Sequence, residues 1–349
     1  MPYADKQMVK APMKPSPSLI YNNLTACEGS LLYAHIRQAC TFALSGMKAS
    51  GVPVDVRKVE SQLGDVKLGD VIHSVTACSH NAFAFIVLAT DAGVQIWDSS
   101  AYHLLYVAPL PAAASLDVSL RHSTFARAAA INVAADGTPH VVFGSSSGSL
   151  FCLPLNEREG RFKGAPAALP AHHKSPITAI GSAYQSRQGK WTEDLGCNLV
   201  TCDEEGGIAV WEALSIGPGY KLLTSIPPSG TPVVSVAVRR DIVVAARLDG
   251  AVQLYGLRDG KLRADMGSAS RLLSSMAIHP TKDIIATAAE DGSLHVWALP
   301  IGGAKADLLL SVCWMHAVLT GVAFCGPTSD DVAVVAYDTD EVHVYKYAA

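Results

Sequence analysis

Short runs in which apolar and polar residues alternate recur along the chain, and each run ends at a tight turn. The stretch from residue 284 to 297, IIATAAEDGSLHVW, shows the pattern clearly. A run of β-branched and small residues leads into Asp291-Gly292, and Leu294 and Val296 then alternate with polar neighbours as far as Trp297. Alternation with a period of two is typical of a half-buried strand, and Asp-Gly is typical of a hairpin turn. The stretch therefore predicts two antiparallel strands joined by a turn.

The same hairpin can be placed in register at six positions of the chain. The third strand of each unit ends at a large apolar residue: Trp97, Leu153, Trp211, Tyr255, Trp297 and Tyr345. Six residues earlier stand the turn residues, of which four are acidic: Asp91, Ser147, Glu205, Asp249, Asp291 and Thr339. These sites lie 42 to 58 residues apart. Units of four strands repeated at about 40–45 residues are typical of β-propeller blades.

Weaker strand signals before residue 70 supply one further unit, so seven units are expected. The last unit has only three strands, at 319–324, 332–336 and 342–345. Residues 1–18 form a polar tail, and its segment 6–12, KQMVKAP, is the unused candidate for the missing strand. We expect this segment to pair beside 342–345 and to close the ring, because an uncovered strand edge promotes aggregation. The chain is then one domain over residues 1–349.

Four of the units resemble blades of the WD-repeat β-propeller family: DAGVQIWD, EEGGIAVWE, LDGAVQLY and EDGSLHVW. The resemblance implies an all-β, seven-bladed propeller closed by an N-terminal strand that completes the last blade. It also implies a buried network within a blade, made of a His, a Ser or Thr, an acidic turn residue and the terminal aromatic residue. Blade 4 fits in part, with His173, Thr201, Glu205 and Trp211.

The other blades keep less of that network. Blade 2 keeps Asp91 and Trp97, blade 5 keeps Asp249 and Tyr255, blade 6 keeps Asp291 and Trp297, and blade 7 keeps Tyr345. A buried polar network stabilises a fold only when every member is satisfied. We therefore expect apolar packing to supply most of the stability, and we interpret these residues as structural.

One branch of the WD-repeat family is similar in finer detail. The similarity rests on YNNL from Tyr21, GVQIWDSSAYHLLY from Gly93, SPITAI from Ser175, ARLDGAVQLYGLRDGKL from Ala246 and VVAYDTDEVHVY from Val334. It implies a compact propeller that works as a non-enzymatic interaction protein, and it implies an association with ciliated cells.

Composition and charge narrow the function classes. The chain is 49% hydrophobic and 17% charged, which suits strands covered on both faces. Its formal net charge is −4, whereas nucleic-acid binding usually needs a basic surface, so no nucleic-acid partner is expected. An N-terminal export signal and an apolar run of ~20 residues are both missing. We expect a soluble cytoplasmic protein without membrane insertion, whose eight cysteines are reduced thiols.

Groups that resemble reactive sites have simpler interpretations. The twelve histidines include no HxxxH or HxH pair beside a carboxylate, so no metal site is expected. Asp338 and Asp340 occupy a predicted turn, where acidic residues are common in this family. GSSSGS from Gly144 matches a phosphate loop or a GxSxG motif only in part, because a strand and not a helix should follow it. We expect no enzyme activity, no cofactor and no small-molecule substrate.

Two long loops interrupt the repeat and are the predicted contact surface for other proteins. They cover residues 156–166 and 185–196, in blades 3 and 4, and both are expected on one face of the ring. They carry Arg158, Arg161, Phe162, Lys163, Arg187, Lys190 and Trp191. Aromatic and basic residues on a rigid scaffold suit a protein-binding hot spot. The alternative is that the loops are solvated and that Trp191 folds back onto its blade.

These features predict a scaffold or adaptor that presents loops to other proteins within a multi-protein assembly, and the finer similarity adds a ciliary or microtubule-associated assembly. The alternative is a substrate receptor of a cullin-type ubiquitin ligase. Such receptors often carry W-D-x-R after the third strand of a blade. Here only YGLR, at residues 255–258, keeps the Arg, and it lacks the Trp and the Asp.

Overall fold

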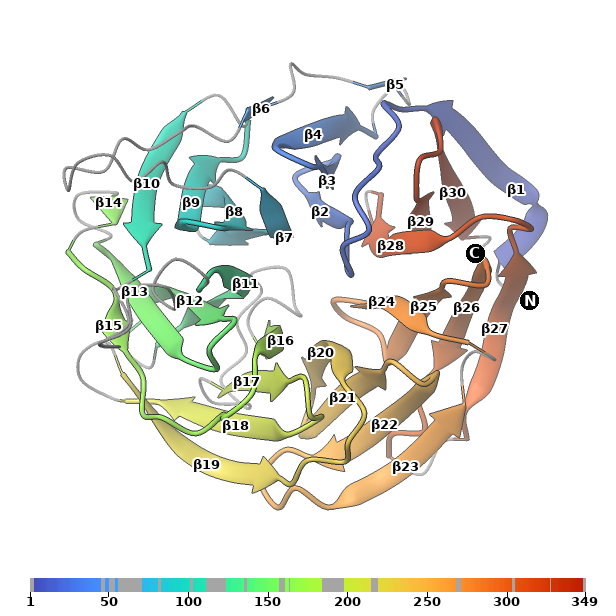
Figure 1. Cartoon of the computed structure of the whole chain (residues 1–349). Coiled ribbons are helices and arrows are strands. Elements are labelled where there is room, and N and C mark those ends of the chain that lie inside the picture. Colours follow the sequence, from blue (N-terminus) through green and yellow to red (C-terminus); the bar gives the residue numbers. More distant parts are fainter. Residues whose placement is uncertain are drawn as a thin grey trace.

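Seven antiparallel sheets surround one axis in the computed structural model of the chain (Figure 1). The structure describes residues 3–44, 48–49, 54–55, 71–80, 83–100, 103–110, 124–134, 137–156, 161–162, 164–183, 198–214, 219–267, 271–302, 305–326 and 328–347. Every regular element in these ranges is a strand. The prediction of an all-β, seven-bladed propeller is therefore confirmed.

The blades follow one another in chain order, and the first strand of each lies nearest the axis. Blade 1 contains β2 (Thr25–Cys27), β3 (Ser30–His35), β4 (Gln38–Ala43), β5 (Lys48–Ala49) and β6 (Val54–Asp55). Blade 2 contains β7 (Ile72–His80), β8 (Phe83–Thr90), β9 (Gly93–Asp98) and β10 (Leu104–Pro109). Blade 3 contains β11 (Ala126–Val133), β12 (Pro139–Ser145), β13 (Leu150–Asn156), β14 (Arg161–Phe162) and β15 (Ala167–Ala168).

The second half of the ring is more regular. Blade 4 contains β16 (Ile177–Ser182), β17 (Asn198–Asp203), β18 (Ile208–Ala213) and β19 (Tyr220–Ile226). Blade 5 contains β20 (Val233–Arg239), β21 (Ile242–Arg247), β22 (Ala251–Gly256) and β23 (Leu262–Gly267). Blade 6 contains β24 (Leu273–Ile278), β25 (Ile284–Ala289), β26 (Ser293–Ala298) and β27 (Asp307–Cys313). Blade 7 contains β28 (Leu319–Cys325), β29 (Asp331–Ala336) and β30 (Glu341–Tyr347).

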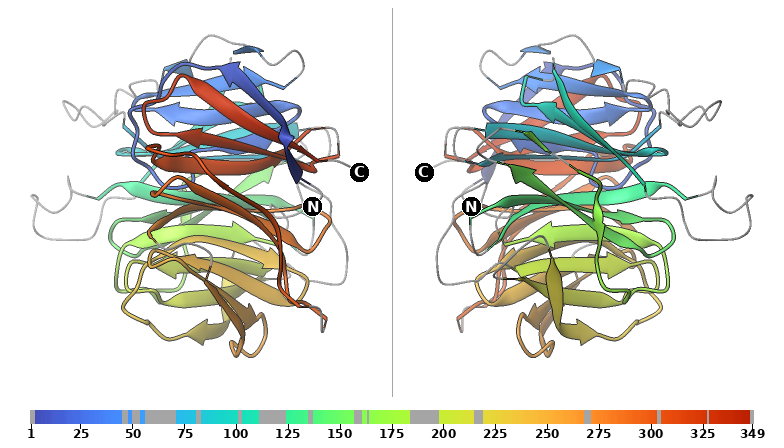
Figure 2. Two further views of the ribbon diagram at one scale, coloured as in Figure 1. Left: turned by 90° about the vertical axis from the view of Figure 1, so that its right-hand side faces the viewer. Right: turned by 90° about the vertical axis from the view of Figure 1, so that its left-hand side faces the viewer.

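The outer strand of blade 7 comes from the other end of the chain. Strand β1 (Tyr3–Pro12) pairs antiparallel with β30, with Val9 opposite Val344 and Pro12 opposite Glu341. Figure 1 shows this pairing, and Figure 2 shows both ends of the chain on the same side of the ring. The predicted closure is confirmed, and the strand begins before the predicted segment 6–12.

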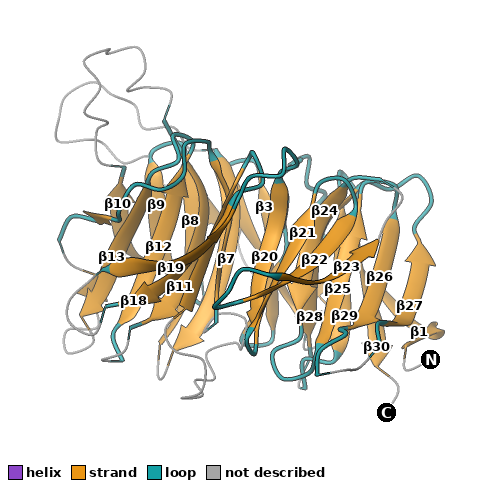
Figure 3. Ribbon diagram, turned by 90° about the horizontal axis from the view of Figure 1, so that it is seen from below, coloured by secondary structure: helices purple, strands orange, loops and turns teal. Residues whose placement is uncertain are grey.

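The strands run between two faces of the ring, and the connecting loops lie at those faces (Figure 3). The upper face carries the turns between the second and third strands of each blade. It also carries the connections from one blade to the next. We call lower face the one with the turns between the first and second strands.

The inner strands approach each other so closely that some positions accept only glycine. A Cβ atom on Gly181 of β16 would lie 2.5 Å from the carbonyl oxygen of Val236 in β20. A Cβ atom on Gly321 of β28 would lie 2.6 Å from the backbone of Asn23. Real Cβ atoms do not approach backbone this closely, so these glycines permit the close packing around the axis.

Hydroxyl groups of the inner strands then connect neighbouring blades. Ser182 in blade 4 donates a hydrogen bond to the carbonyl of Ile131 in blade 3 at 2.5 Å. Ser235 in blade 5 donates to the carbonyl of Met276 in blade 6 at 3.1 Å. Because the protons of these hydroxyls are donated between blades, they stabilise the ring and are not available as donors to a ligand in the central cavity.

Apolar side chains fill the wedges between blades. The fully buried Trp211 lies in the cluster between blades 3 and 4, and Trp97 lies in the cluster between blades 1 and 2. Tyr255 and Tyr345 are buried between blades 4 and 5 and between blades 6 and 7, and Trp297 packs against the cluster between blades 5 and 6. Each anchor residue thus holds its own blade against a neighbour.

Deletion of residues 1–14 is expected to destabilise the whole ring. The deletion removes the pairing of β1 with β30 and takes Ala11 and Met13 out of the core between blades 7 and 1. Loss of one large buried side chain alone costs about 2–5 kcal/mol. Thermal unfolding followed by circular dichroism should show a clear fall in the melting temperature.

Val9→Thr is the matched control for the deletion, because this β1 side chain is exposed and its backbone pairing is kept. We expect the control to change the free energy of unfolding by no more than about 0.5 kcal/mol. A truncated protein that melts like the full chain would refute closure by β1.

Candidate functional site

Blade 4 contains a complete buried network. The indole N–H of Trp211 donates to the Thr201 hydroxyl at 2.8 Å, and Thr201 Oγ1 lies 2.7 Å from Nε2 of His173. Nδ1 of His173 lies 2.7 Å from a carboxylate oxygen of Asp203. The acid of this network is therefore Asp203, the last residue of β17, and not Glu205, which is exposed two residues further along the turn.

The network has the residue types of a hydrolase triad, but its geometry is structural. The Thr201 oxygen already accepts the Trp211 N–H, so its own proton points to His173, and the imidazole N–H points to Asp203. Burial lowers the pKa of His173, which keeps the ring neutral, although Asp203 opposes this shift. All four side chains are buried. A catalytic nucleophile must reach its substrate, and this hydroxyl does not.

Other blades replace members of the network. Arg247 stands at the end of β21, where blade 4 has Asp203, and it donates to the hydroxyl of Tyr255 at 3.1 Å and to the carbonyl of Thr231 at 3.0 Å. In blade 6 the indole nitrogen of Trp297 is buried and has no hydrogen-bond partner among the described residues. Blade 4 thus keeps the polar tetrad, while blades 5 and 6 depart from it.

Three other predicted turn residues, all acidic, form hydrogen bonds within their own turns or to a neighbouring strand. Asp91 bonds Nε2 of His73, at the start of β7, at 2.5 Å. Asp249 accepts the backbone N–H of Ala251 at 3.2 Å. Asp291 accepts the backbone N–H of Ser293 at 2.9 Å. These contacts fix the turns on the upper face and involve no group from outside the chain.

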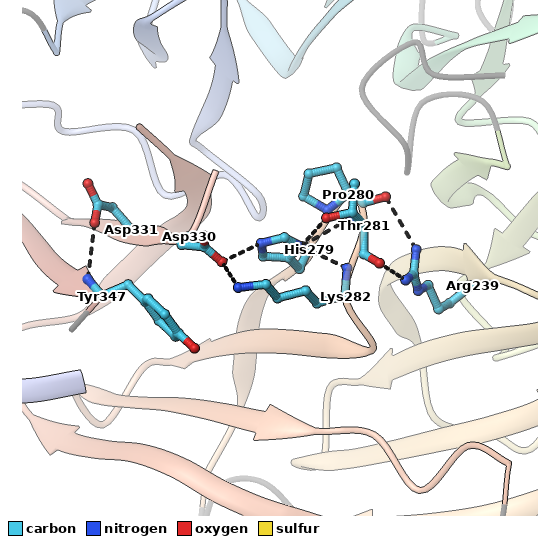
Figure 4. Close-up of polar contacts among 8 residues, drawn as sticks. All are labelled: Arg239, His279, Pro280, Thr281, Lys282, Asp330, Asp331 and Tyr347. Carbon is cyan, nitrogen blue, oxygen red and sulfur yellow. Dashed lines mark hydrogen bonds and ion pairs between the residues drawn. The ribbon is translucent and has the colours of Figure 1, made fainter. Parts of the chain in front are cut away.

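A polar network on the lower face joins blades 6 and 7 (Figure 4). The ring of His279 is buried, and its Nδ1 accepts the backbone N–H groups of Thr281 at 3.1 Å and Lys282 at 2.9 Å. Its Nε2–H therefore donates to Asp330, at 3.0 Å. Lys282 also bonds Asp330 and lies over the ring of Tyr347, 4.4 Å from its centroid. Each polar atom of His279 is satisfied within the fold.

Blade 5 joins the same network through Arg239. Its guanidinium donates to the carboxylate of Asp283 at 2.7 Å, to the carbonyl of Pro280 at 3.2 Å and to the carbonyl of Thr281. Arg239 thus holds the loop between β24 and β25, as Figure 4 shows. The network connects three blades and is a structural feature of the lower face.

Groups suited to chemistry are not gathered elsewhere in the described part of the chain. No three His, Cys, Asp or Glu side chains among the described residues could together hold a metal ion. GSSSGS forms the turn between β12 and β13, with Gly148 at a φ of 82°, as expected for a hairpin. None of the described residues belongs to a helix with the length and hydropathy needed to cross a lipid bilayer.

The two predicted contact loops lie largely outside the described residues. Arg158, Lys163, Arg187, Lys190 and Trp191 are among those not described, so their role stays a prediction. Phe162 is described, and it is buried with its ring centroid 5.4 Å from that of Phe85. Strand β14 pairs with β13, which places Arg161 opposite Asn156 and turns Phe162 into the core. The expectation that Phe162 contacts a partner is therefore corrected.

The chain between β1 and β2 crosses the upper face near the axis (Figure 1). The Asn22 side chain donates to the carbonyl of Val234 in blade 5 at 2.7 Å and accepts the N–H of Met276 in blade 6 at 3.3 Å. Asn22 has a φ of 55°, which asparagine adopts more readily than most residues. One side chain thus bridges two blades on the far side of the axis from blade 1.

Asn23 makes hydrogen bonds to blades 7 and 1. Its backbone N–H donates to the carbonyl of Thr320 in blade 7 at 2.9 Å. Its side chain pairs with the backbone of Ala34 in blade 1, accepting at 2.7 Å and donating at 3.1 Å. Leu19, Ile20, Tyr21, Asn22 and Leu24 are among the residues that line the central cavity, whose volume is about 720 Å³. The segment spans the upper mouth of this cavity.

Exposed apolar side chains collect around that segment. We call upper apolar patch the group Leu19 (64% exposed), Tyr21 (39%), Leu272 (41%), Met315 (71%) and Tyr337 (36%). They lie on the segment between β1 and β2 and on connections at the upper face of blades 6 and 7. Burial and the nearby Glu290 carboxylate raise the pKa of Tyr21, and the backbone N–H of Glu290 donates to the carbonyl of Leu272 at 2.9 Å. The sequence carried one signal for this site, the YNNL stretch from Tyr21, but nothing that located it on the face.

The chain is similar to known proteins over almost its whole length. A model of the WDR54 family matches residues 9–348. The chain belongs to the WDR54 family. Its relatives include WD repeat-containing protein 54 of Mus musculus and of Homo sapiens, each 27% identical over 95% of this chain and 96% of the relative. The WDR54 family is a family of WD-repeat propellers, which are generally non-catalytic.

Solved structures share the fold of this WDR54 family member at low identity. One chain in the crystal structure of a mitotic checkpoint complex matches with a TM-score of 0.69 and 14% identity, over 99% of this chain and 96% of that chain. The computationally designed Ika8 protein matches with a TM-score of 0.56 and 16% identity, over 97% and 98% of the two chains.

Two substitutions distinguish the acids of blade 4. Asp203→Ala leaves the buried N–H groups of His173 and Gly207 without an acceptor, each at a cost of about 1–3 kcal/mol. We expect urea unfolding to show a loss of about 2–4 kcal/mol. Glu205→Ala removes an exposed side chain and should change stability by at most about 0.5 kcal/mol. Equal losses for the two variants would contradict the assignment of Asp203.

Stability is expected to fall as the pH is lowered below 6.5. Burial lowers the pKa values of His173, His279 and His343 from their ordinary value of 6.5. The unfolded chain therefore takes up protons first, so stability is complete above pH 6.5 and declines below it. Each such histidine contributes at most about 1.4 kcal/mol per pH unit.

Urea unfolding of the wild type and of His279→Asn at a series of pH values measures this decline. The Asn side-chain oxygen can accept the N–H groups that His279 accepts, but it does not titrate. The variant should lose less stability than the wild type between pH 6.5 and pH 5. Parallel curves for the two proteins would show that folding does not lower the pKa of His279.

Proposed function

We propose that this protein is a non-catalytic scaffold that binds other proteins through the upper face of its propeller. The single observation that carries the proposal is the collection of exposed apolar side chains around the segment that spans the channel mouth. Large apolar side chains gathered on one part of a surface mark interaction sites more often than chance exposure does. Here they are Leu19, Tyr21, Leu272, Met315 and Tyr337.

The ring beneath the patch supports a binding role. Blades 6 and 7 are joined by stacking of Trp314 on His343, with ring centroids 3.6 Å apart, and by the lower-face network around His279. Trp314 directly precedes Met315, so the patch rests on an immobilised residue. Side chains held on a rigid support lose little entropy when a partner binds.

The proposal contains no catalytic step. The nearest approach to a catalytic arrangement, Thr201 with His173 and Asp203, is buried and fully hydrogen-bonded. The upper apolar patch presents side chains that contribute contact area and no nucleophile or general base. Its chemistry suits recognition.

As a finer form of this proposal, we propose that the scaffold is cytoplasmic and belongs to a ciliary or microtubule-associated multi-protein assembly. This form is supported by the sequence similarity to one branch of the WD-repeat family. Tagged protein expressed in ciliated cells tests it by microscopy. Absence of the tag from cilia and microtubules would remove the finer form and leave the scaffold proposal in place.

Affinity purification from the native cell type tests the scaffold proposal. We expect proteins that co-purify with the wild type to be lost with the double variant Leu272→Ser/Met315→Ser. Both side chains are exposed, so stability should change by no more than about 0.5 kcal/mol per substitution. The double variant Leu222→Ser/Leu262→Ser, on outer strands β19 and β23, is the matched control.

Trp191→Ala in the same experiment tests the long loop of blade 4. Loss of partners with this variant at unchanged stability would assign binding to the loops 156–166 and 185–196. A large fall in stability would instead make Trp191 a core residue. Purifications in which no protein depends on either surface would refute the scaffold proposal.

A further inference from the structure

We propose that the upper apolar patch binds a basic peptide segment of a partner protein, one that combines Lys or Arg with large apolar side chains. The proposal rests on the proposed scaffold function and adds the chemistry of the partner. Three features of the upper face carry it: the position of the patch, the support beneath it and the charges around it.

The patch lies to one side of the axis, over blades 6 and 7. Leu272 precedes β24, Met315 lies between β27 and β28, and Tyr337 follows β29. The backbone N–H of Tyr337 donates to the carbonyl of Val318 at 2.8 Å, which brings the blade 7 turn beside the connection that holds Met315. These connections are consecutive around the ring, so the exposed side chains all lie on the same face of blades 6 and 7.

The channel mouth beside the patch is occupied by the chain itself. Asn22 is bonded to blades 5 and 6, and Asn23 is bonded to blades 7 and 1. Gly321 leaves no room for a Cβ atom beneath this segment. A partner on the upper face therefore meets the patch and the backbone of residues 19–24, and not an open channel.

Acidic residues surround the patch. Glu290 and Asp291 lie in the turn of blade 6, and Asp338 and Asp340 lie in the turn of blade 7. Neither Asp338 nor Asp340 forms an ion pair with a Lys or Arg among the described residues.

Arg271 directly precedes Leu272, and Arg37 lies in the blade 1 turn whose Ile36 N–H donates to Ser18. The turns of blades 6 and 7 carry the four acids and no Lys or Arg. Cationic side chains of a partner complement this charge. The same charge repels a nucleic acid or an anionic membrane, both of which require a basic surface.

Tyr21 connects the apolar and the acidic parts. Burial of its side chain and the nearby Glu290 carboxylate raise the pKa of Tyr21. The hydroxyl therefore stays protonated, and the Tyr21 side chain lies near the Glu290 carboxylate. A tyrosine close to a carboxylate favours a Lys or Arg side chain, through its π-face and through charge.

Selection of a random peptide library, displayed on phage, against the full-length protein tests the inference. We expect the enriched peptides to carry a net positive charge together with Leu, Met or aromatic residues. The most enriched peptide is then synthesised, and its dissociation constant is measured by fluorescence anisotropy. Leu272→Ser/Met315→Ser should weaken its binding about tenfold or more, because two buried apolar contacts are lost.

Variants that remove negative charge from the blade 7 turn test the electrostatic part of the inference separately. Asp338→Asn/Asp340→Asn should weaken binding about three- to tenfold and should reduce its dependence on salt. The matched controls are Asp241→Asn/Asp307→Asn on the lower face and Leu222→Ser/Leu262→Ser on the outer strands, and these should bind like the wild type.

Three outcomes would overturn the inference. These are no enrichment, enrichment of neutral or acidic peptides, and binding that both patch variants leave unchanged. Failure here is distinguishable from failure of the scaffold proposal, which is decided by the native partners. If those partners are lost with the patch variant while no basic peptide binds, the scaffold stands and the chemistry of its partner is different.

Discussion

Completion of the last sheet by the first strand is the interaction on which the rest of the structure depends. Blade 7 has a fourth strand, like the other blades, only when β1 occupies the outer place beside β30. The same pairing places the start of the following segment at the rim, from where it reaches the axis and contributes Asn22 and Asn23. Ring closure and the upper face are therefore built by one stretch of chain. The hydroxyl bridges between inner strands complete a framework in which neighbouring blades hold each other in place.

Most of the fold could be predicted from the sequence because it depends on local patterns that repeat. Alternating apolar residues, an acidic turn and an aromatic anchor recur often enough to fix the number of blades and to leave one outer strand missing. The acid of blade 4 was misassigned for a local reason. Asp203 and Glu205 stand two residues apart, and counting back from Trp211 cannot show which side chain faces His173. Phe162 was assigned to an exposed loop because it is flanked by Arg161 and Lys163, whereas its pairing with β13 turns the ring into the core.

The candidate site was much less predictable, because it is assembled from distant parts of the chain. Asn22 bonds residues 212 and 254 positions away, and no periodicity in the sequence records such a contact. Leu272, Met315 and Tyr337 stand in three separate connections between strands. A single exposed apolar residue is unremarkable. That these three residues share one face becomes apparent only in the folded ring, where their connections lie on the upper face of blades 6 and 7.

The order in which the ring is assembled has a consequence for how the protein is made. Strand β1 is synthesised first, but its partner β30 begins only at Glu341. At about 5–20 residues per second, roughly 20–70 s pass before the two strands can meet on a ribosome. During that time the edge of β1 is unprotected, and two chains growing near each other can exchange this strand. Concentration of nascent chains, and any chaperone that holds the first residues apart, therefore determines how much of the protein becomes a closed monomeric ring.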